Sequence, residues 1–354
     1  MKYLHRNFKN YNFILRNKIY ISMKKLLFGA LMLGFMSACN SDNLSNQNEE
    51  SQNNLTASGT GTALQRGCAS EEIRKNALQS SAELRQKYSE LESRTEKFEN
   101  DLKLGKVLSD GSVEIPVVVN VLYRTSSENL SDSRIAEQIA VLNADYAGSN
   151  SDVNKIPTEF QSVKAGDVKV RFRLANTVRK STTKTSWSTN DAMKKSSSGG
   201  IDATSPSNYL NIWVVGNMGQ ILGYATFPES AGLWNDGVVI AAPYFGKTGA
   251  SSPFNLGRTA THEVGHYLNL RHIWGDANCG NDLVADTPTQ TGANSGKPSY
   301  PLYNTCSGTQ RSVMFMNYMD YVDDAAMFMF SSGQRSRMQS VVASSGARSG
   351  LRLY

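Results

Sequence analysis

The chain has 354 residues, of which 40% are hydrophobic and 19% are charged, so it can bury a sizeable core and is not disordered throughout. The formal net charge is +6, but residues 1–28 hold seven basic residues and no acidic one, and the rest of the chain carries 30 basic against 31 acidic residues. A nucleic-acid partner bound through a basic face therefore has no support in the composition.

The N-terminal region has the pattern of an export signal. Met23, Lys24 and Lys25 precede an apolar run at residues 26–38, and small residues come directly before Cys39. This pattern is typical of a secretory signal peptide, and the run is shorter than the roughly 20 residues that a membrane-spanning helix needs. We expect residues 1–38 to be an N-terminal extension and signal peptide. The end of the run is similar to a bacterial lipobox, which makes Cys39 the expected lipidation site, with plain cleavage as the alternative.

Two segments separate the export signal from the main domain. Residues 39–65 are rich in Asn, Ser, Gln, Thr and Gly, which indicates a solvated linker. Between residues 71 and 106 the chain becomes charged and helix-prone, as a surface helix or coiled coil would be. Its place after the export signal favours a removable pro-segment, which we predict at residues 66–93, with the main domain at 94–354.

The first half of the main domain alternates between strand and helix patterns. Residues 113–123 are β-branched and mostly apolar, which predicts a buried strand. Ser131 begins a helix with apolar residues at helical spacing, and residues 168–174 alternate as a half-exposed strand does. Three more strands are predicted at residues 209–215, 221–227 and 237–244. We therefore expect an α/β fold, with a mixed five-stranded twisted sheet and one backing helix.

Three of the four histidines, His262, His266 and His272, fall within eleven residues. Positions four apart share one face of a helix, so His262 and His266 can bind one metal ion. His272 lies six residues further on, out of helical register, and joins them only if the chain turns sharply after Leu268. Asn269 has to make this turn, and asparagine is the residue that tolerates a left-handed backbone best after glycine.

These residues form a His-Glu-x-x-His-x-x-Asn-x-x-His motif, a variant of the glycine-containing metzincin signature. Three histidines and a water molecule make an open zinc site, whose metal activates the water and polarises a scissile carbonyl. Glu263 is the predicted base, which takes the proton of the water and later delivers it to the leaving amine. An unrelated helix face and a closed structural zinc site are the alternatives, and the third histidine argues against the first.

The motif is followed by the segments VADTPTQ and MNYMDYVDDAAMFMFSSGQRSRM. Together these residues resemble the pappalysin family of metzincin zinc metalloendopeptidases, and in particular its ulilysin- and mirolysin-like members. The resemblance implies a catalytic domain with an upper subdomain to about residue 274 and an irregular lower subdomain at 275–354, which ends in a helix near 334–342. It also implies that Met319 forms a turn beneath the zinc and that Tyr321 donates to the oxyanion. Plain core packing is the alternative for both.

The resemblance also implies how a protein or peptide substrate binds. The strand with Gly223 and Ala225 resembles the upper rim of the cleft, where backbone hydrogen bonds bind an extended peptide. Asp323 or Asp324 would lie at the base of the pocket beside the zinc and favour Arg or Lys after the cut. The sequence does not distinguish the two aspartates, and ordinary surface acids are the alternative.

Calcium and a disulfide follow from the same resemblance and from export. The segment around Asp286 and Thr287 offers the oxygen ligands that calcium prefers, although solvated turns have the same composition. Cys279 and Cys306 flank this loop-rich segment, and an oxidising compartment lets them pair. Closing a loop of about 28 residues stabilises a fold by roughly 3–4 kcal/mol in the chain-entropy model.

Cys68 lies in the predicted pro-segment, where its thiolate can bind the zinc and keep the enzyme latent. A chance free thiol is the alternative. An enzyme that cuts before Arg can remove its own pro-segment, and the Ser93–Arg94 bond is the candidate cleavage site.

The sequence thus predicts a secreted or lipid-anchored zinc endopeptidase that is made as a zymogen. Its expected contact with a membrane is a lipid anchor alone. Two alternative functions are disfavoured. A cell-surface lipoprotein that only binds its partner would not need the base Glu263. An aminopeptidase would need a group that blocks one end of the cleft, whereas the rim strand binds an extended peptide.

Overall fold

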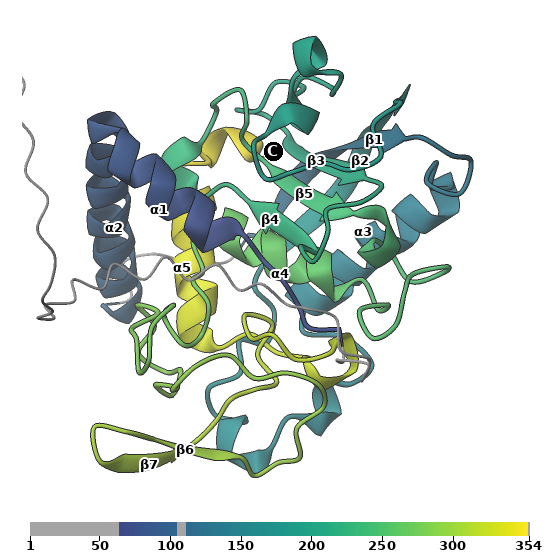
Figure 1. Ribbon diagram of the computed structural model, residues 1–354. Coiled ribbons are helices and arrows are strands. Elements are labelled where there is room, and N and C mark those ends of the chain that lie inside the picture. Colours follow the sequence, from purple (N-terminus) through teal and green to yellow (C-terminus); the bar gives the residue numbers. More distant parts are fainter. Residues whose placement is uncertain (1–63, 105–110, 353–354) are drawn as a thin grey trace, which may run out of the picture. The chain divides into compact units, whose positions relative to one another are not determined.

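A computed structural model describes residues 64–104 and 111–352, which belong to one compact unit, Thr60–Tyr354 (Figure 1). The predicted signal peptide, Cys39 and all but the last residues of the linker lie outside the described part. Within it, no helix combines the length and the apolar character that crossing a membrane requires.

The centre of this unit is a five-stranded sheet in the order β2-β1-β3-β5-β4. Strand β1 (Val113–Tyr123) pairs in parallel with β2 (Val170–Ser181) and with β3 (Leu210–Val215), and β3 pairs in parallel with β5 (Val238–Ala241). Strand β4 (Gly223–Ala225) lies at the edge and runs antiparallel to β5. The predicted mixed five-stranded sheet is confirmed.

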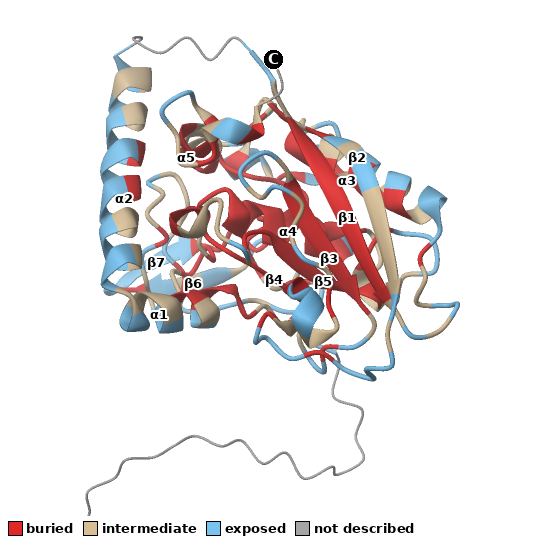
Figure 2. Cartoon of the chain, turned by 90° about the horizontal axis from the view of Figure 1, so that it is seen from above, coloured by how far each residue is buried: buried red, intermediate tan, exposed pale blue. Residues whose placement is uncertain are grey.

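Both faces of the sheet are covered, which explains why β1 has almost no polar residues. Val117, Val119 and Val121 pack in one core cluster with residues of α3 (Asp132–Tyr146) and α4 (Arg258–Tyr267). Leu122 lies in a second cluster on the other face, under the loops that precede β3. In Figure 2 the central strands and α4 are buried along their length.

The helices begin at capping residues that the sequence supplies. Ser131 accepts a hydrogen bond from Arg134 N at the start of α3, and Ser331 caps α5 (Ser332–Val342) in a capping box with Gln334. Ser81 separates α1 (Ser70–Ser80) from α2 (Ala82–Lys103) and caps the second of them.

After α4 the chain is mostly irregular, apart from a hairpin of β6 (Tyr303–Cys306) and β7 (Thr309–Ser312) and the helix α5. Helix α2 packs beside α5 (Figure 1), where the hydroxyls of Thr95 and Ser340 lie 3.1 Å apart. The charged segment before the main domain is therefore helical and packs against α5.

Candidate metal centre and active site

Helix α4 and the turn after it bring three imidazoles to one point. His262 and His266 lie one helical turn apart, and α4 ends at Tyr267. Asn269 has a φ of 74°, in the left-handed region, and the chain then returns His272 to the site. The Nε2 atom of His266 lies 3.2 Å from that of His262 and 3.1 Å from that of His272.

The other ring nitrogen of each histidine is fixed by an oxygen atom. The partners of His262, His266 and His272 are the Tyr318 carbonyl at 2.7 Å, the Leu270 carbonyl at 2.8 Å and the Asp276 carboxylate at 2.5 Å. Burial lowers the pKa of His262 and His266, so these rings are neutral. A neutral imidazole that donates from Nδ1 presents its Nε2 lone pair to a metal ion.

Cys68 completes a set of four donors. Its Sγ and one nitrogen of each of the three imidazoles all lie within 4.8 Å of one another. Three imidazoles and a thiol at this spacing fit zinc, which takes nitrogen and sulfur ligands in tetrahedral geometry. Among the residues that the structure describes, this is the one such group of His, Cys, Asp or Glu.

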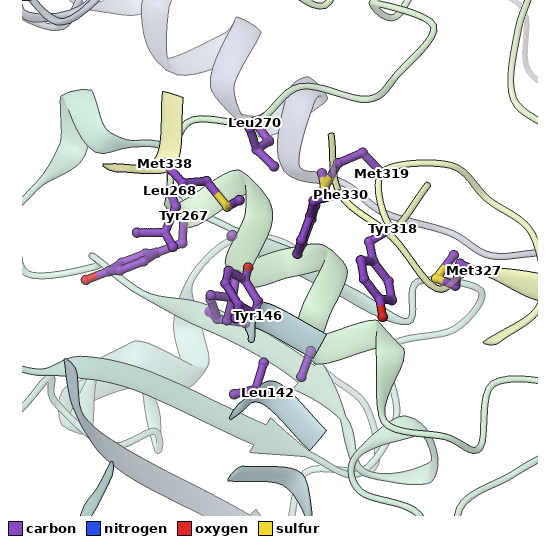
Figure 3. Packing of buried hydrophobic residues seen from close by; sticks show 14 of the residues in the cluster. Leu142, Tyr146, Tyr267, Leu268, Leu270, Tyr318, Met319, Met327, Phe330 and Met338 are labelled. Carbon is purple, nitrogen blue, oxygen red and sulfur yellow. The ribbon is translucent and has the colours of Figure 1, made fainter. Parts of the chain in front are cut away.

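Met319 packs against α4, the helix that carries His262 and His266. A Cβ atom added at Gly265 would lie 2.5 Å from its sulfur, so a larger residue at this position would displace the Met319 side chain from α4. The rings of Tyr318 and Phe330 pack nearby in the same apolar cluster, with 4.7 Å between their centroids (Figure 3). The Tyr318 hydroxyl also donates to Asp145, a buried acid that the sequence pattern did not identify.

Glu263 is buried beside the four donors and is not one of them. Its Oε2 accepts a hydrogen bond from Ser70 Oγ at 2.9 Å and lies 3.3 Å from Cys68 Sγ. Burial raises the pKa of Glu263 to about 7. A carboxyl group with a pKa near neutrality exchanges protons readily at physiological pH.

Tyr321 lies at the edge of the same site. Its ring centroid is 4.9 Å from that of His272, and its hydroxyl donates to the Cys68 carbonyl at 3.3 Å. Burial raises the pKa of Tyr321, so the hydroxyl stays protonated and able to donate. It is thus aimed at a backbone carbonyl next to the metal-binding donors.

Residues 67–70 add to the edge strand β4 in the parallel direction. Leu222 N donates to Gly67 O at 2.8 Å, and Gly223 forms a parallel bridge with Cys68. Ala225 N donates to Ser70 Oγ at 2.8 Å. The rim positions predicted to bind peptide are therefore bonded to the chain's own N-terminal segment.

The structure separates the two aspartates that the sequence left equivalent. Asp324 is fully buried, and its Oδ1 lies 2.5 Å from Nη2 of Arg66, while Asp323 is partly exposed. The Oδ2 of Asp324 accepts hydrogen bonds from Leu256 N and Arg258 N. Arg66 had no assigned role in the sequence, because only the folded chain brings it to Asp324.

The predicted disulfide between Cys279 and Cys306 is confirmed.

The two predicted calcium ligands have hydrogen-bond partners within the protein. Asp286 accepts hydrogen bonds from Ser331 and Gly333 at the start of α5, and Thr287 donates to Asp282 at 2.8 Å. Calcium at Asp286 and Thr287 therefore stays a prediction. Asp276, which belongs to the same acidic segment, orients His272 instead.

An edge strand beside a helix with converging imidazoles, a left-handed turn to the third and a methionine packed against that helix define a metzincin-like zinc peptidase. The Peptidase_M43 family, described as "Pregnancy-associated plasma protein-A", matches residues 198–343. The "Extracellular metalloprotease" of Pyricularia oryzae is 34% identical over 243 residues, which are 66% of this chain and 76% of that protein. The "Extracellular metalloprotease 1" of Coccidioides posadasii is 33% identical and covers 65% and 76%.

Two solved structures from Tannerella forsythia are also similar. Mature mirolysin with a cleaved peptide is 42% identical, covers 69% of this chain and 97% of its own, and gives a TM-score of 0.67. A promirolysin mutant is 39% identical, covers 82% and 98%, and gives 0.71. The chain belongs to the pappalysin family of metzincin metallopeptidases, with mirolysin-like structural relatives. It is a metalloendopeptidase.

Proposed function

We propose that this protein is an exported zinc endopeptidase, made as a latent zymogen, in which Glu263 is the general base. His262, His266 and His272 would hold the zinc, which supplies Lewis acidity toward a water molecule and the scissile carbonyl. The observation that carries the proposal is the convergence of the three Nε2 atoms beside a buried carboxylate. The zinc content and peptide hydrolysis of the activated wild type and of His272→Ala test it.

Glu263 takes a proton from the attacking water and returns it to the leaving amine. Its position supports this role, because it lies directly below the rim strand: a Cβ at Gly223 would be 2.9 Å from Glu263 Cγ. Tyr321 donates to the carbonyl oxygen on which negative charge develops. Its present hydrogen bond to the Cys68 carbonyl supports that role, because a substrate carbonyl beside β4 would offer the same acceptor.

The substrate is an extended peptide that adds to β4 through the backbone of Gly223 and Ala225, with Arg or Lys after the cut. Arg66 supports this preference, because its guanidinium already occupies the pocket of Asp324. It lies over the ring of Phe254 at 4.7 Å and donates to Thr259 Oγ1 at 3.2 Å. A planar guanidinium fits such a site better than an apolar side chain does.

Latency comes from Cys68, which occupies the place of the catalytic water among the three imidazoles. The segment 67–70 also covers β4, and Arg66 fills the pocket of Asp324. The predicted boundary at Ser93–Arg94 falls inside α2, where the backbone is helical and not extended as strand addition requires. We therefore extend the pro-segment from 66–93 to the end of α2. The match to promirolysin covers 82% of this chain, and the match to mature mirolysin covers 69%. This difference in coverage supports a longer pro-segment.

Cys68→Ala in the full-length chain is expected to hydrolyse peptide before any processing, at a rate about tenfold or more above that of uncleaved wild type. The thiol no longer competes for the water position, and about 1.4 kcal/mol of lost competition gives a factor of ten. Initial rates and N-terminal sequencing at each time point measure this. Wild type is expected to gain activity together with an N-terminus after α2.

The matched control is Ser89→Ala, a change on the exposed face of α2 that should leave latency intact. An uncleaved Cys68→Ala chain as inert as wild type would refute the role of the thiol. An active wild-type form that begins inside α2 would refute the longer pro-segment.

Export follows from the predicted signal peptide and from relatives that are named extracellular metalloproteases. Lipidation of Cys39 would anchor the enzyme to a membrane surface. Detergent-phase partitioning tests the anchor, because a freely secreted chain stays in the aqueous phase.

A calcium ion in the acidic loop after α4 would order this part of the lower subdomain. Asp282 supports the proposal, because burial raises its pKa to about 6 and a cation would favour its charged form. Elemental analysis of the purified protein decides the point, and a zero calcium content would refute it.

A further inference from the structure

Arg74 is a second arginine of the pro-segment that is buried against the catalytic domain. It lies on α1, and its Nε donates to Oε1 of Glu229 at 2.7 Å. Its guanidinium carbon lies 4.0 Å from the ring centroid of Phe227. A carboxylate and an aromatic face are the two groups that recognise a guanidinium.

This site adjoins the catalytic centre. Phe227 follows β4 by two residues, and its ring centroid lies 5.2 Å from that of the zinc ligand His266. Residues 67–70 run along β4, so Arg66 precedes the paired stretch and Arg74 follows it. Helix α1 contacts β4 where this stretch ends (Figure 1). The two arginines therefore lie beyond opposite ends of the stretch that pairs with the rim strand, one at Asp324 and the other at Glu229.

Removal of the pro-segment leaves Glu229 without its ion-pair partner. Among the described residues, the ion pair of Glu229 is with Arg74, and its Oε2 accepts no hydrogen bond. Arg348 is near enough to interact electrostatically with Glu229, but its guanidinium binds Asp236 and the carbonyl of Tyr267. This removal would leave a carboxylate and an aromatic ring at the place beyond β4 that Arg74 fills in the latent form.

We propose that Glu229 and Phe227 form a second subsite for a basic side chain in the mature enzyme, on the amino-terminal side of the cut. The proposal rests on the proposed function, in which Asp324 takes the residue after the cut and the opposite end of β4 takes residues before it. The mature enzyme thus selects peptides with basic residues on both sides of the scissile bond. Arginine binds better than lysine, because its planar group stacks on Phe227.

The test uses the full chain after activation and peptides with Arg fixed after the cut. A second Arg is placed at each position before the cut in turn, and kcat/KM is compared with that of the peptide without it. Wild type is expected to favour Arg at one position by about tenfold. Glu229→Gln should lose this preference and keep both the preference after the cut and the rate on the peptide without the second Arg.

Glu114→Gln is the matched control, because Glu114 is a partly exposed β1 residue that pairs with Arg173, and it should keep both preferences. The retained rate on the reference peptide shows that the Glu229→Gln chain is folded. No preference before the cut in wild type, or one that survives in Glu229→Gln, overturns the subsite and leaves the proposed function standing. No cleavage of any peptide by wild type overturns both.

Discussion

Glu263→Gln is expected to lower kcat for peptide hydrolysis by about 10²–10⁴-fold, the contribution typical of general acid–base catalysis. Glutamine keeps the shape of the side chain, but it does not accept the proton of the water. The three imidazoles are unchanged, so zinc content and melting temperature should match those of wild type. Steady-state kinetics of the activated form measure the effect.

Glu114→Gln is again the matched control and should keep the wild-type rate. Chelator-sensitive hydrolysis at the wild-type rate in Glu263→Gln would refute the assigned base. A fall in activity together with loss of zinc would assign Glu263 to the metal site itself, which would contradict its place outside the group of four donors.

Asp324→Asn is expected to lower the preference for Arg over Met after the cut by at least about 30-fold in kcat/KM. Removing the charge of one partner of a buried, hydrogen-bonded pair costs about 2 kcal/mol or more, which corresponds to that factor. Asp324 is fully buried and in contact with Arg66 in the latent form, so a substrate guanidinium at the same place depends on it.

The neighbouring Asp323→Asn is the control, because Asp323 is partly exposed and does not touch Arg66 in an ion pair. The ratio of kcat/KM for the two peptides is measured within each variant, so a change in the amount of folded enzyme cancels. If Asp323→Asn lost the preference and Asp324→Asn kept it, the base of the pocket would be Asp323, and the assignment of Asp324 would be refuted.

The sequence predicted the strands where their apolar pattern is strong. Strand β1 has the predicted bounds, because a strand buried on both faces is a continuous apolar run. Strand β2 extends to Ser181, beyond the predicted end at residue 174, because its later residues are polar and partly exposed while their backbone still pairs with β1. Backbone pairing leaves no trace in hydropathy.

The zinc motif was visible in the sequence because its spacing is local, and Asn269 adopts the left-handed conformation that the spacing requires. The contacts of Arg66 and Arg74 were not visible. Each joins residues more than a hundred positions apart, and an arginine in a polar N-terminal segment looks like any exposed one. The predicted pro-segment boundary at Ser93–Arg94 was placed inside α2 for the same reason. Glu92 of α2 pairs with Arg337 of α5, and such a contact between residues far apart in the chain is not visible in the sequence.

The zinc content of the activated protein tests the central claim most directly, namely that a turn at Asn269 brings His272 into a three-imidazole site. Elemental analysis of wild type, Asn269→Gly and His272→Ala is the measurement. Wild type and Asn269→Gly are expected to hold one zinc ion per chain, because glycine adopts the same turn, while His272→Ala loses both zinc and hydrolysis. A His272→Ala chain that keeps its zinc and its activity would contradict the account.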